Sequence, residues 1–262
     1  MRRMRHIKAR EFQGCDIAYD FSNPASLYDA TSGGSLVAAD GAIARANDLS
    51  GGSGHMTQGT SANRPLRKVA ALNGLDVARF DGSNDCLTAG DVADLLDKPV
   101  EMYVVHKKSG SADYQGIFGK SRVGAAKGKW SFLSDKDSNK HTFILSDRTT
   151  TTESAVGPTR STNLEILHGY GPRTAGTNAS VAVNFVNGKT EYATTGYTAD
   201  TGSINTTDQV CIAVYQDSSG APGSFNYYAG DIGECAKYSV TFTSAQRCRL
   251  DMSRCRKWRI AS

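Results

Sequence analysis

Long hydrophobic runs are missing from this chain of 262 residues, and so are long stretches of Leu, Ala, Glu and Lys. No apolar run approaches the roughly 20 residues that a membrane-spanning helix needs, so we expect no membrane contact. The basic start MRRMRHIKAR is not followed by the apolar segment of a secretory signal peptide. A secretion precursor is therefore not expected.

Local motifs for metal binding and nucleophilic catalysis are also missing. No two cysteines stand at CxxC spacing and the five histidines do not gather near them, so a zinc site is not expected. Gly-x-Ser-x-Gly is absent, and the GGSG at 51–54 lacks the Lys-Ser/Thr that completes a phosphate-binding loop. Four of the histidines are scattered, which favours surface or packing roles: His55, His106, His141 and His168.

The residues that are present favour β structure. Glycine is abundant, Ser and Thr are frequent, and short segments alternate apolar with polar residues between turn signals. The strongest strand is VEMYVVHK, and Asn187-Gly188 predicts a hairpin turn. The expected strands are 15–21, 75–87 with its DGSND turn, 100–107, 115–120, 129–133, 141–145, 163–170, 179–186, 191–193, 209–215 and 228–239. Residues 29–63 are expected to be a long loop region with at most one short strand and no core element, and residues 146–163 a loop.

One helix is expected near the end of the chain, from about Ser244, whose hydroxyl can cap the first turn, to residue 260. Many short strands and one late helix predict an all-β fold, an antiparallel β-sandwich of the jelly-roll kind with one short C-terminal helix. We expect a basic N-terminal arm over residues 1–14 and one domain over 15–262 that includes the basic helix 244–260.

Positive charge gathers near both ends. We expect these residues to dock an acidic partner: Arg2, Arg3, Arg5, Arg247, Arg249, Arg254 and Arg256. The alternative is a solvated arm and a solvated helix face. Nucleic acid is an unlikely partner, because Trp258 is the one aromatic residue interleaved with the basic ones.

The six cysteines are candidates for disulfides: Cys15, Cys86, Cys211, Cys235, Cys248 and Cys255. Cys248 and Cys255 share a face of the expected helix but lie about 10 Å apart along it, too far to bond to each other. We favour some disulfides, to another strand or another chain, over reduced and buried thiols, with the pairing left open.

Two motifs carry a resemblance to a known family. The stretch RPLRKVAALNGLDVARFDGSNDCL resembles the opening of the LamG-like jelly rolls of the concanavalin A-like lectin/glucanase superfamily. The ending YAGDIGECAKYSVTFTSAQRCRLDMSRCRKWRI resembles their last strand and helix, and Cys86 departs from the pattern where an aromatic residue is common. The resemblance implies that the last strand pairs beside the first, and that the helix packs Leu250 and Trp258 on the sandwich and turns its Arg and Cys residues outward.

The resemblance raises the question of catalysis and of calcium. Glycosidases of this fold usually carry a Glu-x-Asp-x-Glu array on one strand; none of the six glutamates here stands in one, so we expect no enzyme and no catalytic residues. Two groups could offer oxygens to calcium, although turn formation is the favoured interpretation and metal binding stays open: Asp81, Asn84 and Asp85, and Asp135, Asp137 and Asn139. No cofactor is expected.

Sugar binding would use exposed aromatic residues near the Gly/Ser/Pro loop: Tyr215, Phe225, Tyr227 and Tyr228. We therefore expect a non-enzymatic structural or decoration protein on a virus particle, from a bacteriophage, that docks through its basic ends and has glycan-binding capacity. Its partners would be other virion proteins and copies of itself. The alternative is a carbohydrate-binding module on a bacterial cell surface, and a glycoside hydrolase is the third and weakest hypothesis.

Overall fold

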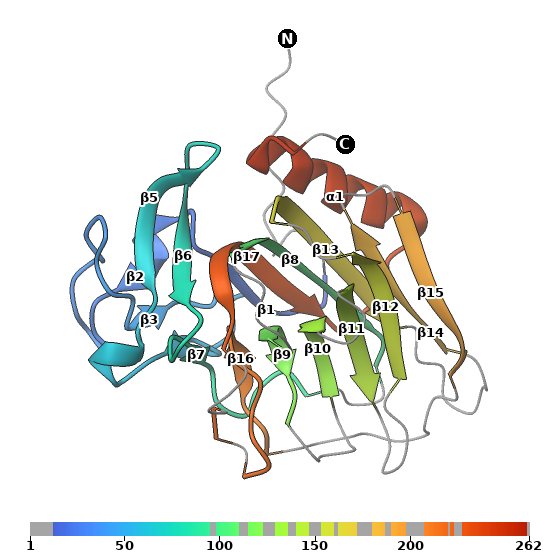
Figure 1. The fold of residues 1–262 in the computed structure, drawn as a ribbon, viewed down its shortest axis with the longest axis horizontal. Coiled ribbons are helices and arrows are strands. Elements are labelled where there is room, and N and C mark those ends of the chain that lie inside the picture. The colour runs from blue at the N-terminus through green and yellow to red at the C-terminus, as the bar shows by residue number, and fades with distance from the viewer. Residues whose placement is uncertain are drawn as a thin grey trace.

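Two antiparallel sheets stacked face to face make up the protein, as the sequence predicted (Figure 1). The structure is a computed structural model that describes residues 13–94, 98–109, 115–122, 129–135, 140–146, 153–159, 162–171, 180–186, 190–197, 207–219, 221–222 and 227–260. Within these ranges one sheet has eight strands and the other nine. The sandwich is capped on one side by the α-helix α1 (Ser244–Trp258).

The first sheet has the order β15-β14-β13-β8-β17-β6-β5, and β1 also pairs with β17. Its strands are β1 (Cys15–Asp20), β5 (Leu66–Leu72), β6 (Leu75–Asp81), β8 (Val100–Lys108), β13 (Leu164–Gly171), β14 (Ser180–Val186), β15 (Thr190–Tyr197) and β17 (Ala229–Tyr238). The late strand β17 therefore pairs with the first strand, which confirms the expected closure of the sandwich. Strands β14 and β15 pair from Val186 and Thr190 outward; the expected turn at Asn187-Gly188 lies outside the described residues.

The second sheet has the order β12-β11-β10-β9-β16-β7-β4-β3-β2. Its strands are β2 (Leu27–Tyr28), β3 (Arg45–Ala46), β4 (Met56–Thr57), β7 (Leu87–Thr88), β9 (Gln115–Lys120), β10 (Lys129–Asp135), β11 (Lys140–Ser146), β12 (Glu153–Thr159) and β16 (Val210–Ile212). Strands β10 and β11 pair antiparallel, as their sequence pattern predicted.

Two segments expected to be loops are partly strands. Within residues 29–63, β3 and β4 extend the edge of the second sheet, and Ile43 and Met56 are buried in the core between the sheets. Strand β12 lies inside the expected loop 146–163. Strands β3 and β4 have two residues each, too few to show an alternating pattern, which is why sequence periodicity missed these two strands.

The main core lies between the sheets and follows from the alternation of side chains along each strand. In β8, Met102 and Val104 point into this core, whereas Tyr103 and Val105 point to the opposite face, beneath α1. Because both faces of β8 are covered along its middle, residues 102–105 form a continuous apolar run.

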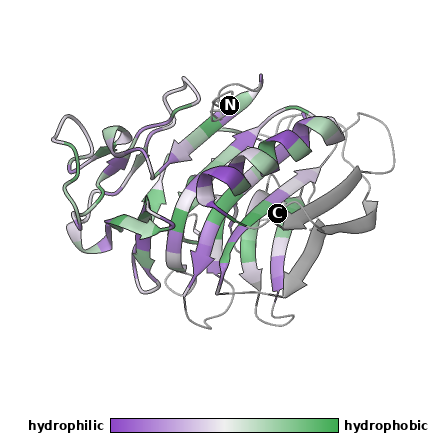
Figure 2. Cartoon of the chain, turned by 90° about the horizontal axis from the view of Figure 1, so that it is seen from above, coloured by the Kyte–Doolittle hydropathy of each residue, from purple (hydrophilic) through white to green (hydrophobic). Residues whose placement is uncertain are grey.

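The residue that caps the helix lies one position before the expected one. Thr243 rather than Ser244 caps it: the Thr243 hydroxyl accepts from the N–H of Gln246, and the Gln246 side chain accepts from the N–H of Thr243. This reciprocal arrangement is a capping box, which stabilises the first turn. Leu250 and Trp258 are fully buried against the sheet, as expected. In Figure 2, α1 lies across the strands with hydrophobic and hydrophilic segments alternating along it.

The two motifs that suggested the LamG-like resemblance meet at the end of this helix. Asn73 and Gly74 both adopt left-handed backbone conformations in the turn between β5 and β6, and the Asn73 amide donates to the carbonyl of Trp258. The Trp258 ring lies directly over Gly233 of β17, where any Cβ would stand 2.3 Å from the ring.

Among the described residues, no helix is long and apolar enough to cross a membrane.

Candidate functional site

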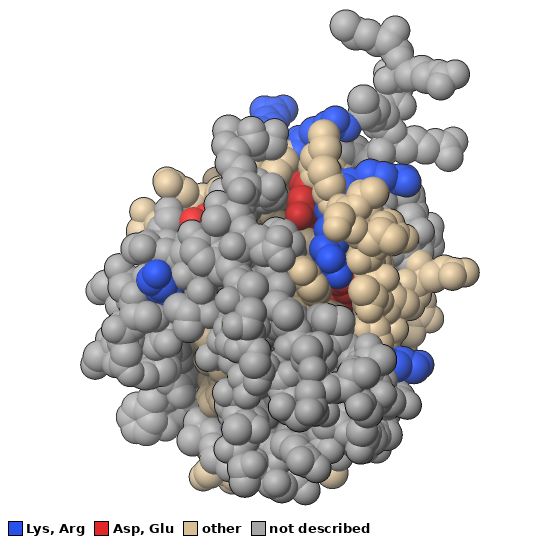
Figure 3. All heavy atoms as spheres, turned by 90° about the vertical axis from the view of Figure 1, so that its right-hand side faces the viewer, with Lys and Arg blue, Asp and Glu red and all other residues tan. Residues whose placement is uncertain are grey.

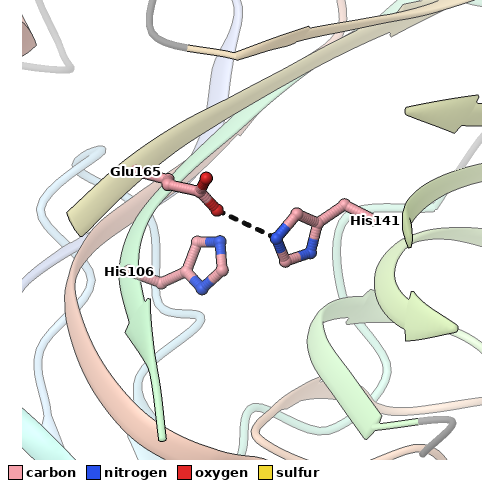
Figure 4. A group of neighbouring side chains, drawn as sticks. All are labelled: His106, His141 and Glu165. Carbon is pink, nitrogen blue, oxygen red and sulfur yellow. Dashed lines mark hydrogen bonds and ion pairs between the residues drawn. The ribbon is translucent and has the colours of Figure 1, made fainter. Parts of the chain in front are cut away.

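A group of polar side chains lies inside the sandwich, where the strand pattern would otherwise place apolar residues. Each polar residue stands two positions from a core residue on its strand, so it points the same way. His106 of β8 is two residues from Val104. Glu165 of β13 is two residues from Leu167, and His141 of β11 is two residues from Phe143. The residues His106, His141 and Glu165 are all buried, and we call them the His/His/Glu cluster. They come from both sheets, so the fold alone brings them together (Figure 4).

The geometry of this cluster is close enough for a shared ligand. One ligand atom from each residue lies within 4.8 Å of the other two. The Nε2 atom of His141 lies 2.9 Å from Oε2 of Glu165, and the two imidazole rings meet edge to face with centroids 5.0 Å apart. On its far side, Nδ1 of His106 lies 2.9 Å from the hydroxyl of Tyr228, which is itself buried.

Two ring nitrogens of the cluster have no hydrogen-bond partner within the described ranges. They are Nε2 of His106 and Nδ1 of His141, both buried. Burial, the neighbouring His141 ring and the charge of Lys108 hold the pKa of His106 well below its ordinary value, so its ring stays neutral. A neutral imidazole keeps one nitrogen with a free lone pair, which is the form that binds metals.

Further polar groups continue the cluster towards the end of the sandwich. Lys108, two residues beyond His106 on the same face of β8, is buried and donates to the side-chain oxygen of Gln115 on β9. Ser134 of β10 stands opposite His141 and is fully buried. The interior here therefore gathers an imidazole, an amide, a hydroxyl and an ammonium group within one patch.

A second polar cluster lies on the outer face of the first sheet, beneath α1. His168 is buried between Asp251 of α1, 2.8 Å from Nδ1, and Glu101 of β8, 3.1 Å from Nε2. Burial alone would lower the pKa of His168, but the two carboxylates raise it to about 9. Glu101 also accepts from Arg247 and from the N–H of Phe242. This cluster fastens the start of the helix.

The end of the helix is fastened in the same way. Glu234 of β17 lies 2.7 Å from Nε of Arg254, 2.8 Å from Nζ of Lys257 and 3.2 Å from Nε1 of Trp258. Burial by itself would raise the pKa of Glu234, but Arg254 and Lys257 hold it below its ordinary value. Arg254 also donates to the hydroxyl of Tyr103.

These contacts correct the expected docking face of the helix. Arg254 is buried, because it lies on the same helical face as Leu250 and Trp258, so it cannot dock a partner. Arg247 is half-buried against Glu101 and the Tyr170 ring. Arg249 and Arg256 are exposed. Figure 3, which views the right-hand side of Figure 1, shows several Lys and Arg residues near the top, with Asp or Glu residues beside them. The arm residues Arg2, Arg3 and Arg5 lie outside the described ranges.

No disulfide forms within the chain, since all six cysteines are free, and a disulfide to another chain stays a prediction. Cys86 and Cys211 pack together with Val214 as buried thiols, and Cys255 is buried under the helix rather than facing outward. Burial raises the pKa of Cys86 to about 11 and that of Cys211 to about 12, which keeps both protonated and unreactive. Cys248 is exposed.

The four aromatic candidates for sugar contact separate into three groups. Tyr215 and Tyr227 are half-buried, at the ends of the loop that joins β16 to β17. Tyr228 is fully buried and hydrogen-bonded to His106, so it cannot touch a glycan at the surface, contrary to expectation. Phe225 lies outside the described residues.

The first expected calcium ligands form a turn. The Asp81 carboxylate accepts from the N–H groups of Ser83, Asn84 and Asp85, and Asp85 in turn accepts from the N–H of Asp81. Hydrogen bonds of this kind are how Asp residues build turns, which supports the turn-forming interpretation. In the second group, Asp137 and Asn139 lie outside the described residues.

Sequence reasoning missed the His/His/Glu cluster because its members lie far apart in the chain. The histidines were expected to be surface or packing residues, and only the pairing of β8 with β13 sets His106 opposite Glu165. A signal did exist: each of the three residues stands at an inward position of its strand, where a polar side chain costs free energy unless it has a partner.

Comparison with known proteins identifies the fold but no family. No protein-family model matches this sequence, and neither does any curated protein. Domain 4 of AbnA, a GH43 extracellular arabinanase from Geobacillus stearothermophilus, in complex with arabinotriose, is similar over 91% of this chain and 98% of its own, with a TM-score of 0.56 and 14% identity.

Two larger proteins contain a similar sandwich. A GH54 α-L-arabinofuranosidase matches 91% of this chain with a TM-score of 0.59 and 14% identity, and this chain spans 62% of its length. The botulinum neurotoxin serotype D ligand binding domain in complex with N-acetylneuraminic acid matches 94% of this chain with a TM-score of 0.56 and 9% identity, and this chain spans 52% of it. The structural neighbours are thus β-sandwich domains of carbohydrate-binding and glycoside hydrolase proteins.

Proposed function

We propose that this chain is a non-enzymatic carbohydrate-binding module displayed on the surface of a virus particle, specifically a bacteriophage. One observation carries the carbohydrate part: the chain matches 98% of an arabinanase domain whose structure holds arabinotriose. That neighbour is a sandwich of the same extent as this chain. The match supports a whole-domain likeness to a sugar-binding unit rather than to a fragment of a catalytic domain.

The proposed sugar contact lies around Tyr215 and Tyr227. Tyr227 packs over the cluster of Cys86, Cys211 and Val214, which fixes the position of its ring. The hydroxyl of Tyr215 donates to the carbonyl of Arg122. Aromatic rings held beside a few polar groups are the usual composition of a small-ligand site, because sugars offer both apolar faces and hydroxyls.

Three buried glutamates support a non-enzymatic role. A retaining glycosidase needs two carboxyl groups about 5 Å apart and available to the substrate. Glu101 and Glu234 are each committed to buried contacts with cationic side chains, and Glu165 is bonded to His141. Freeing any one of them for catalysis would break a contact that holds the fold together.

Glycan binding can be tested with an array of arabinose-containing and sialylated oligosaccharides. We expect a reproducible hit for the full chain, and at least a tenfold loss of affinity in Tyr227→Ala and Tyr215→Ala. Tyr28→Ala is the matched control, since Tyr28 is also half-buried but stacks under Arg45 at the far edge of the second sheet. No hit, or equal losses in all three variants, would remove the proposal. Release of reducing sugar would instead favour a hydrolase.

Display on a particle is supported by the LamG-like sequence resemblance to phage and bacterial surface proteins, and by the exposed Arg249 and Arg256. We expect quantitative mass spectrometry of purified particles to find the chain at a fixed copy number. The double substitution Arg249→Glu and Arg256→Glu should release the chain from the particle. The control Lys107→Glu, which changes an exposed residue on β8, should not. Recovery from a bacterial cell surface instead of particles would favour a cell-surface module.

A further inference from the structure

We propose that His106, His141 and Glu165 form a zinc-binding site inside the sandwich, and that the metal clips the two sheets together. The proposal is independent of glycan binding. It begins from the donor set, because two imidazole nitrogens and one carboxylate oxygen lie within 4.8 Å of one another in a buried place. This is the ligand set of zinc sites that keep a fourth position open.

The distances fit with small adjustments. Donors held tetrahedrally at about 2.1 Å from a zinc ion lie about 3.4 Å apart. His141 and Glu165 already lie 2.9 Å apart, and their hydrogen bond keeps the two donors side by side until a metal replaces the shared proton. No two donors are more than 4.8 Å apart, so the His106 donor is at most about 1.4 Å farther than this ideal separation. In Figure 4, one nitrogen of that ring faces the other two residues.

An unsatisfied atom gives the second observation. Nε2 of His106 is buried and has no hydrogen-bond partner among the described residues. Leaving such an atom without a partner is unfavourable, and a metal ion at this place would give it one. The opposite nitrogen, Nδ1, contacts the hydroxyl of Tyr228 at 2.9 Å. A hydrogen bond to the non-ligating nitrogen is how ligating histidines are oriented, so Tyr228 is a positioning residue for this site.

The chemistry of the donors selects the kind of metal. Imidazole nitrogen is a poor ligand for calcium and magnesium, which prefer all-oxygen surroundings. Two imidazoles with one carboxylate suit zinc and its neighbours in the first transition row. The ligands come from β8 and β13 in one sheet and from β11 in the other, so a bound ion links the two layers at one place.

The test uses the full chain without a histidine tag, stripped with a chelator and titrated with Zn²⁺ or with Co²⁺ as a spectroscopic substitute. We expect one equivalent to bind, a rise in melting temperature, and visible d–d absorption with Co²⁺. His106→Gln and Glu165→Gln should lower the affinity at least about 100-fold. His55→Gln and Cys248→Ser, which change exposed donors, should leave the affinity unchanged.

Tyr228→Phe keeps the proposal testable if the ligand variants fail to fold. It removes only the hydroxyl that orients His106, and we expect about a tenfold loss of zinc affinity with an altered Co²⁺ spectrum. A purely structural role for Tyr228 would change the melting temperature of the metal-free protein but neither of these readouts. The proposal is overturned if the stripped chain binds no stoichiometric metal, or if the ligand variants and Tyr228→Phe bind as tightly as the natural chain.

Discussion

Two buried histidine clusters lie on opposite faces of the first sheet, and they are built differently. Beneath the helix, His168 has a carboxylate on each ring nitrogen, and the cations and anions around it balance. Between the sheets, His141 contacts the carboxylate of Glu165 and His106 contacts the hydroxyl of Tyr228, and each ring keeps one nitrogen without a described partner. In the first cluster both ring nitrogens of His168 are bonded, and these bonds hold the helix in place. In the second cluster one ring nitrogen of each histidine could still bind a ligand.

Breaking the helix-side cluster should have the largest effect. We expect Glu234→Ala to lower the free energy of unfolding by about 3–5 kcal/mol, because it removes the buried carboxylate that contacts both Arg254 and Lys257. Chemical denaturation measures the loss. Asp40→Asn, which removes the charge from the exposed ion pair with Lys68 and still tolerates the left-handed backbone at this position, is the control and should leave the unfolding midpoint where it was. Equal effects would mean that the buried contacts do not hold the helix.

The charge on His168 should make the stability of the cluster at the start of the helix depend on pH. Its folded pKa of about 9 lies above the ordinary value of 6.5, so the stabilisation is fully present below pH 6.5 and is lost as the pH rises through 9. The difference in unfolding free energy between the natural chain and His168→Gln should shrink by on the order of 3 kcal/mol over that range. A difference that stays constant with pH would show that His168 is neutral, as His106 is.

A smaller effect is expected where the helix touches the sheet without charge. Gly233→Ala would place a methyl group 2.3 Å from the Trp258 ring, and overpacking of this kind costs about 1–3 kcal/mol. Thermal unfolding gives the measurement. Gly59→Ala is the matched control, because nothing lies within 4 Å of its new Cβ. If Gly233→Ala is as stable as the control, the helix end can move and the contact is not rigid.

The sequence predicted the layers of this fold better than its site. The β-favouring segment 100–107 and the polar turn between 129–133 and 141–145 correctly indicated strands and a hairpin, because both signals are local. Strand β12 was missed, since its Gly-Pro pair is typical of a loop. Arg254 could have been placed inward, because it stands four residues from Leu250 and from Trp258.

The His/His/Glu cluster could not be predicted in the same way. Its three members belong to strands that are separated in the chain, and strand pairing across two sheets is not written in any short motif. The absence of CxxC spacing argued against zinc only for sites built from neighbouring residues. A sandwich can assemble metal ligands from strands that are distant in sequence, so rules based on the spacing of neighbouring residues do not apply to such sites.

Strand β17 has a kinetic consequence. It lies between β8 on one side and β1 with β6 on the other, and Cys15 pairs with Tyr238. A growing polypeptide cannot complete this sheet until residues 229–238 have left the ribosome, so the early strands must wait with their edges unpaired. Such long-range closure makes folding slow and leaves nascent chains open to aggregation, which is where a chaperone would act.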